Sequence, residues 1–503
     1  MNDLEKIKEN FKNYIRKFKT CDLLYYFSKK SIESYKKDKK AFTFIDIPCY
    51  TKYGSPLGKF PFCYGQWELV QICYYSIKFS NDYRGKSINN DSDYYSLINQ
   101  NKIYDESIEN IDKNMDDIKL FEHLQCITNF QFDFQTLHVS SRFNRLYEII
   151  MNINKNDKFC KTKDVCYIDF ETIFENITGI KISKFINIYF FLILLSSSIG
   201  TPYILDIIKN IQFDIELLGF TKDEILQVIE FQSRDYEFYR NSDNWNLLKC
   251  YPIVKLKSKE NNYIISNIYS LLYSFPESIY WILRNYYKEI KSNDFTNYFG
   301  YCFECYLTQL FEKYNINAEK LKESKVRRIK TPDWKIETTN YIFLIEQKSA
   351  LFPINTRTNT KQERFDELEK YINNNIIEAF KQLNSYQIES SDKTIIRICL
   401  TFEKIYTEEN MKLIVERNMN FSSDIDLNWI VNIDEFEILI QKLSDDENDF
   451  NRIIQKKITL EKNKDKNGRN FETILKGYEY GYIHELNHFI RLVEELKNKL
   501  KNI

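Results

Sequence analysis

The chain has 503 residues, and its 71 Lys and Arg residues nearly balance its 72 Asp and Glu residues, for a formal net charge of -1. A chain of this length exceeds what one compact core usually contains, so two or more domains are expected. Hydrophobic residues at 43% and charged residues at 28% exclude a disordered chain. The near-zero net charge excludes a protein that coats itself with nucleic acid, so any polyanion must bind at a local patch.

The cysteines and the first residues indicate the cellular compartment. The chain has 11 cysteines, an odd number without a secretory framework. The first residues, MNDLEKIKENFKNY, contain no apolar signal-peptide core. We therefore expect a reduced, cytoplasmic protein.

Helical apolar spacing predominates in residues 1–245, which contain no motif that assigns them a role. One uncharged run, residues 185–205, is about long enough to cross a bilayer. It contains Asn187, three serines and Pro202, and it lies in the middle of the chain. These features favour a buried core helix, so no membrane partner is expected.

The pattern changes after residue 245. Residues 246–290 read as a hairpin, YPIVKLKSKENNYIISN, followed by a helix that connects to the next region. Residues 291–445 alternate helices with β-rich runs, which predicts an α/β domain with a mixed central sheet flanked by helices. Residues 446–503 read as a charged helical extension. The fold class expected is therefore a multidomain α+β or α/β protein with a helix-rich N-terminal region.

The most informative stretch is TPDWKIETTNYIFLIEQKSA, residues 331–350. The turn-forming ETTN separates two β-rich runs, so 333–337 and 341–348 are expected to pair as a hairpin. Side chains alternate along a strand, which puts Glu346 and Lys348 on the same face at its end. The hairpin would bring Asp333 close to Glu346.

Two carboxylates held close together repel each other unless a cation or a proton lies between them. Oxygen ligands without a nearby His or Cys favour Mg²⁺ or Mn²⁺ over zinc. Lys348 would add a positive charge suited to a phosphate or an activated water. The alternative is an ordinary salt bridge between Asp333 and Lys348 at a sheet edge.

These residues resemble the PD-(D/E)xK nuclease superfamily, through Pro332-Asp333 and then Glu346-Gln347-Lys348. Upstream, Glu304 lies in a predicted helix, where family members often carry a further acidic ligand. Downstream, QLNSY matches the Gln-x-x-x-Tyr motif of the RecB-type branch, through Gln382 and Tyr386. The resemblance covers about residues 295–440.

The resemblance implies a restriction-endonuclease-like domain that hydrolyses phosphodiester bonds with Mg²⁺ or Mn²⁺. Its metal ligands would be Asp333, Glu346, Glu304 and the carbonyl of Ile345. Lys348 would orient or help to deprotonate the attacking water.

Under the same resemblance, Gln382 and Tyr386 would act near the metal and the nucleic-acid backbone. DNA is expected as the substrate rather than RNA. The biological context implied is that of an effector in bacterial restriction or anti-phage defence. The N-terminal region would then recognise a target or partner protein, and a homodimer is a further possibility because many such nucleases cut two strands.

A basic segment, residues 320–330, precedes the hairpin. Its candidate nucleic-acid contacts are Lys325, Arg327, Arg328 and Lys330. A solvated charged face is an equally good interpretation of this segment.

Two other functions remain open. HELNH, from His484 to His488, has the His-Glu-x-x-His form of a zinc peptidase helix. No third zinc ligand is evident, because Glu494 and Glu495 belong to the same helix. The other alternative is a binding scaffold with a nuclease fold and an inactive site.

Overall fold

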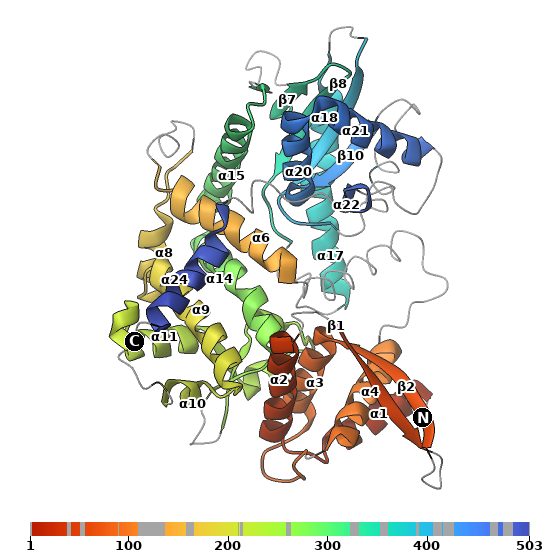
Figure 1. Cartoon of the computed structure of the whole chain (residues 1–503), viewed down its shortest axis with the longest axis vertical. Coiled ribbons are helices and arrows are strands. Elements are labelled where there is room, and N and C mark those ends of the chain that lie inside the picture. The colour runs from red at the N-terminus through yellow and green to blue at the C-terminus, as the bar shows by residue number, and fades with distance from the viewer. Residues whose placement is uncertain are drawn as a thin grey trace.

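A computed structural model of the chain describes residues 3–37, 42–50, 56–88, 90–108, 136–156, 165–209, 211, 215–257, 263–321, 331–352, 361–388, 392–405, 415, 427–462, 471–475 and 486–501. These residues form many helices and three sheets, two of which mix parallel and antiparallel strands. The expected combination of α and β structure is confirmed. Figure 1 shows the largest sheet at one end of the molecule and the N-terminal elements at the other.

The N-terminal elements combine helices with a hairpin that the sequence patterns did not predict. The helices are α1 (Asp3–Ile15), α2 (Thr20–Lys37), α3 (Gln66–Phe79) and α4 (Asp91–Ile108). The hairpin pairs β1 (Phe42–Tyr50) with β2 (Pro56–Gly65) in antiparallel register. Both strands contain proline, which cannot donate a ladder hydrogen bond, and a two-stranded hairpin tolerates it because each strand has an open edge.

Helices also make up most of the middle of the chain, as expected. They are α6 (Thr136–Tyr147), the π-helix η2 (Glu148–Ile153), α8 (Phe170–Thr178), α9 (Ile182–Ile199), α10 (Ile204–Lys209), the short 3-10 helix η3 (Ile215–Leu218), α11 (Lys222–Gln232), α12 (Tyr236–Arg240), α13 (Leu247–Cys250) and α14 (Ile268–Glu289). Helix α14 contacts α2, α6, α8, α9 and α13, so it is the central helix of this region.

Helix α9 is the apolar run noted in the sequence. It is the one described helix long and apolar enough, by length and composition, to cross a membrane. In the structure 56% of it is buried, including Phe185, Tyr189 and Phe191. It packs against α2, α14 and α24 (His488–Lys501). This packing fits the expected core helix.

The predicted hairpin at residues 251–267 is present. Strand β4 (Ile253–Lys255) pairs antiparallel with β5 (Tyr263–Ile265), and β3 (Ser233–Asp235) adds a parallel strand on the other side of β4.

The largest sheet has five strands in the order β10-β9-β8-β7-β6. These strands are β6 (Ala318–Lys320), β7 (Trp334–Glu337), β8 (Tyr341–Lys348), β9 (Thr394–Thr401) and β10 (Leu427–Asn432). Strands β7 and β8 form the predicted antiparallel hairpin, whereas β8, β9 and β10 run parallel. A mixed sheet is therefore confirmed.

Strand β8 is buried on both faces, as its apolar sequence predicts. Ile342 and Leu344 pack into one hydrophobic cluster, whereas Phe343 and Ile345 pack into another. This alternation carries Glu346 and Lys348 onto the face of Ile342 and Leu344.

Helices cover both faces of this sheet. On the face of Phe343 and Ile345 lie α15 (Asp294–Lys313), α20 (Ile433–Asp445) and α21 (Glu447–Lys462). The other face is covered by α17 (Lys361–Tyr371), the π-helix η4 (Ile372–Ile377) and α18 (Glu378–Ser385), which follow one another without a break. A short helix, α22 (Phe471–Ile474), follows near the C-terminus.

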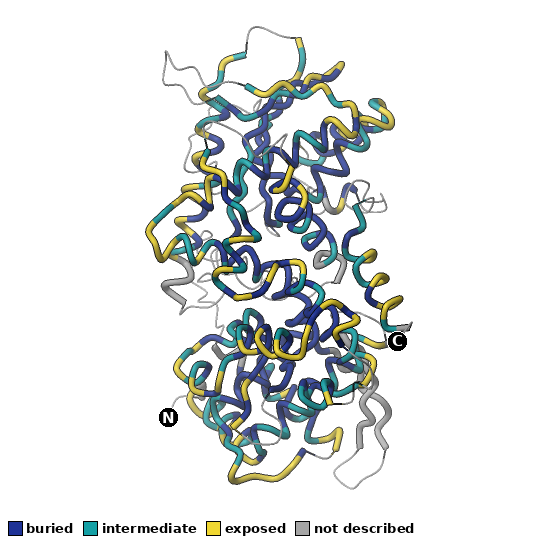
Figure 2. Tube along the Cα trace, turned by 90° about the vertical axis from the view of Figure 1, so that its left-hand side faces the viewer, coloured by how far each residue is buried: buried dark blue, intermediate teal, exposed yellow. Residues whose placement is uncertain are grey.

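The hydrophobic core does not break at the region boundaries expected from the sequence. One cluster contains Tyr239, Leu248, Phe295 and Phe450, one residue from each of the four regions. Figure 2 shows buried segments along the whole length of the molecule. The N-terminal region and the five-stranded sheet therefore share one apolar interior.

A buried ion pair also links the N-terminal region to the helices that pack on the five-stranded sheet. Arg145 of α6, with its side chain 3% exposed, donates to Glu437 of α20 at 3.0 Å and to Asp434 at 2.6 Å. The hydroxyl of Tyr306, from α15, donates to the same Glu437 oxygen at 2.6 Å. The neighbouring acids raise the pKa of Arg145 despite its burial, so it stays charged.

Candidate functional site

The hairpin brings the two predicted acids together at the end of β8. Trp334 lies opposite Ile345 in the register, so Asp333, just before β7, reaches the level of Glu346. The Gln347 backbone N–H donates to Asp333 Oδ2 at 2.8 Å. The Asp333 carbonyl in turn accepts from the N–H of Leu321, beside β6. Asp333 is thus anchored from both neighbouring strands.

Glu346 is held by two side chains of the predicted set. Lys348 Nζ donates to Glu346 Oε1 at 2.8 Å, and Gln382 Nε2 donates to Oε2 at 2.8 Å. Gln382 lies on α18 and also donates to the Thr331 carbonyl, just before Asp333. The structure therefore gathers Asp333, Glu346, Lys348 and Gln382 into one cluster.

Glu346 is buried, whereas Asp333, Lys348 and Gln382 are partly buried, and this burial shifts the pKa values of the two acids. Burial, followed by the charge of Asp333, raises the pKa of Glu346 to about 7. Burial also raises the pKa of Asp333, against the stabilising hydrogen bond from Gln347. The charge of Asp333 disfavours the ionised form of Glu346, as expected for two acids that are held close together.

For Lys348, burial and the neighbouring charge shift the pKa in opposite directions. Burial alone lowers the pKa of its ammonium, but the carboxylate of Glu346 outweighs burial and the pKa is raised. Its side chain is 20% exposed, so it is partly accessible to solvent. The site thus offers a protonated ammonium to an incoming anion.

Glu304 does not join the two acids as a third close carboxylate. It lies on α15 as predicted, near enough to raise the pKa of Asp333 through its charge. Its carboxylate instead forms an ion pair with Lys320 of β6. Across the described part of the chain, no three His, Cys, Asp or Glu side chains gather closely enough to hold one metal ion.

The remaining predicted residues lie around the cluster or outside the described residues. Tyr386 follows the last residue of α18 and packs, half-buried, against the second hydrophobic cluster. Ile345 is fully buried opposite Trp334, within the β7–β8 ladder. The predicted nucleic-acid contacts lie outside the described residues, namely Lys325, Arg327, Arg328 and Lys330.

Two contributing residues were missed in the sequence. Gln347, the middle residue of the Glu-x-Lys motif, anchors Asp333 through its backbone and accepts from Trp334 Nε1 at 3.1 Å through its side chain. Its position between Glu346 and Lys348 could have identified it as part of the site. Lys320, the partner of Glu304, had no such signal because only the β6–β7 pairing brings it near.

The competing HELNH motif has a different geometry. His484 and Glu485 lie outside the described residues. Asn487 is not helical and has φ 45°, and α24 begins at His488. The His488 ring is buried, with Nε2 2.9 Å from Glu148 Oε2 and Nδ1 3.4 Å from Arg491. In this structure both nitrogens of His488 therefore have protein partners.

We expect His488→Ala to lower the free energy of unfolding by about 1–3 kcal/mol, because it leaves the buried Glu148 carboxylate without this partner. Chemical denaturation measures the loss, and His488→Gln is the matched control because its amide retains a donor. Zinc content measured by mass spectrometry should be negligible in wild type and variant. Stoichiometric zinc that disappears in His488→Ala would contradict a structural role for His488 and would favour the zinc peptidase.

Searches of protein-family models, curated proteins and solved structures found no match to this chain.

Proposed function

We propose that the chain is a Mg²⁺- or Mn²⁺-dependent nuclease whose active site is the Asp333–Glu346–Lys348 cluster at the end of β8. The observation that supports this proposal most is the buried carboxyl group of Glu346 with the partly buried carboxyl group of Asp333 close to it, both held beside a protonated lysine. A merely structural salt bridge needs one acid and one base. A second acid, partly buried and close to the first, is costly unless a cation balances it.

The residues present suit a hard divalent cation. Asp333 and Glu346 supply carboxylate oxygens, and Mg²⁺ is commonly held by one or two carboxylates together with substrate phosphates and water. A cation bound between the two carboxylates would offset their mutual repulsion. The Glu304 carboxylate could join only after leaving Lys320, so we propose two protein carboxylates as the core of the site.

The bound metal would supply Lewis acidity and an activated water. The raised pKa of Lys348 keeps it protonated near neutral pH, so its role would be to stabilise charge that develops on the phosphate. Gln382 would hold Glu346 in place through its amide. Tyr386 stays a proposed backbone contact on the strength of the resemblance alone.

The mixed sheet with helices on both faces supports the proposal of a restriction-endonuclease-like fold, which the sequence motifs imply. From the same resemblance we propose DNA as the substrate and a role in restriction or anti-phage defence. The N-terminal region would recognise the target or a partner.

Metal binding is expected to depend on pH in a defined direction. Glu346 is protonated below its pKa of about 7, so a metal ion must displace a proton there. Mn²⁺ affinity measured by calorimetry should therefore rise about tenfold between about pH 6 and about pH 8. Glu337→Gln, which changes an exposed acid on β7, is the control and should show the same rise. Equal affinity at both pH values would contradict metal binding through Glu346.

A cleavage assay tests the function directly. Supercoiled plasmid, linear duplex DNA and single-stranded RNA would each be incubated with the full chain and Mg²⁺, Mn²⁺ or EDTA. We expect cleavage with metal and none with EDTA. Binding of Mn²⁺ without cleavage of any substrate would instead favour the inactive scaffold.

A further inference from the structure

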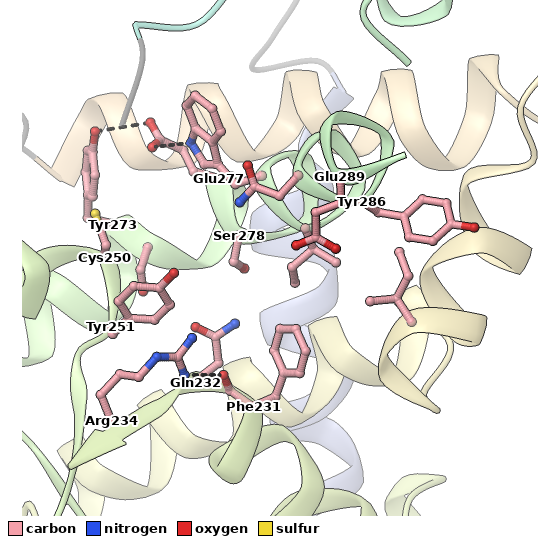
Figure 3. A pocket seen from close by; sticks show the side chains of 15 residues that line it. Phe231, Gln232, Arg234, Cys250, Tyr251, Tyr273, Glu277, Ser278, Tyr286 and Glu289 are labelled. Carbon is pink, nitrogen blue, oxygen red and sulfur yellow. Dashed lines mark hydrogen bonds between the residues drawn. The ribbon is translucent and has the colours of Figure 1, made fainter. Parts of the chain in front are cut away.

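A second candidate site shares no residue with the Asp333–Glu346–Lys348 cluster. It is a cavity of about 290 Å³ between α14 and the junction where α11 runs directly into β3. Figure 3 shows Arg234 and Gln232 on one side of the cavity and Glu277 and Tyr273 on another. Small-molecule sites commonly start near this volume.

Aromatic rings make up much of the cavity wall. They come from α11, from the loop before β4 and from α14, and they are Phe231, Tyr251, Tyr273, Trp281 and Tyr286. Rings from several directions favour a flat ligand that can stack against them. An aliphatic ligand would use less of this surface.

Arg234 supplies a directional positive charge. Its guanidinium stacks on the Tyr251 ring, 4.0 Å from the ring centre. Nη1 donates to the carbonyls of Phe231 and Ser233. Among the described residues, Nε and Nη2 of Arg234 have no hydrogen-bond partner. That edge of the guanidinium suits a carboxylate or similar anion in a two-point contact.

The acids of the cavity do not cancel this charge. Glu277 is buried and already accepts from Arg142, from the Tyr273 hydroxyl at 3.1 Å and from Trp281 Nε1 at 3.4 Å. Glu289 is exposed, so solvent screens it. Among the described residues that line the cavity, Arg234 is the one cationic side chain, which disfavours a polyphosphate.

We propose that this cavity binds a small planar aromatic molecule with one anionic group, which Arg234 recognises. The aromatic walls hold the ring system, and the guanidinium edge pairs with the anion. This site is independent of the proposed nuclease activity.

Calorimetry with two probes tests the proposal on the full chain. The probes are 2-naphthoate, which is a planar monoanion, and 2-naphthamide, which is its neutral isostere. We expect saturable binding of 2-naphthoate, and Arg234→Gln should weaken it about tenfold or more because it removes a charge-assisted contact. The binding of 2-naphthamide should change much less.

Arg452→Gln, at an exposed arginine on α21, is the matched control and should leave both affinities unchanged. Ser278→Trp keeps Arg234 and fills the cavity from α14, so it should abolish binding of both probes. Circular dichroism would establish that each variant is folded. The proposal is overturned if 2-naphthoate fails to bind wild type saturably, or if folded Arg234→Gln or Ser278→Trp binds it as well as wild type does.

Discussion

Lys348→Ala is expected to lower the rate of metal-dependent DNA cleavage by about a hundredfold or more, because it removes a preorganised positive charge from the reacting phosphate. The ammonium is held 2.8 Å from Glu346 and stays protonated through that contact. Plasmid nicking at saturating Mn²⁺ measures the loss. The variant should still bind Mn²⁺, since both carboxylates remain.

The matched control for this variant is Lys335→Ala. Lys335 lies on the neighbouring strand β7 and forms an ion pair with the exposed Glu337. Its removal should leave cleavage within about twofold of wild type, because an exposed pair contributes little. Asp333→Asn should abolish both cleavage and Mn²⁺ binding. Full cleavage by Lys348→Ala and Asp333→Asn would refute the assignment of this active site.

Arg145→Ala is expected to destabilise the protein by about 3–5 kcal/mol, because it leaves the buried Glu437 without its cation. Urea denaturation followed by circular dichroism measures the change in the free energy of unfolding. Replacing both residues, with Arg145→Met and Glu437→Leu, should recover part of the loss, since the carboxylate that then lacks its cation is Asp434, which is partly exposed.

Arg452→Ala is the control for this second prediction. Arg452 is 76% exposed and pairs with Asp449 on the same helix, so its loss should change the free energy of unfolding by less than about 1 kcal/mol. An Arg145→Ala protein as stable as this control would show that the buried ion pair contributes little to the fold.

The elements around β8 were predictable because their signals are local. The alternation of Ile342, Phe343, Leu344 and Ile345 directly assigns the two faces of a strand. The turn residues between β7 and β8 then determine which residues pair. The register, and with it the approach of Asp333 to Glu346, follows from those two patterns.

Other features depend on contacts between distant segments and could not be predicted. The position of Glu304 in α15 was correct, but its pairing with Lys320 depends on where the short strand β6 lies. The β1–β2 hairpin was missed because its prolines and glycines weaken the strand signal. The cavity beside Arg234 is assembled from segments between Ile177 and Glu289, so no motif marks it.

The shared hydrophobic core determines which parts of this protein can be expressed alone. Helix α24 returns from the end of the chain to α6 and α9, and Arg145 joins α6 to α20. Residues 291–445 expressed alone would therefore expose apolar faces and the acids Asp434 and Glu437 to water. Truncated or fused proteins that contain only residues 291–445 should therefore be insoluble. Point variants of the intact chain keep the packing that holds the Asp333–Glu346–Lys348 cluster in place.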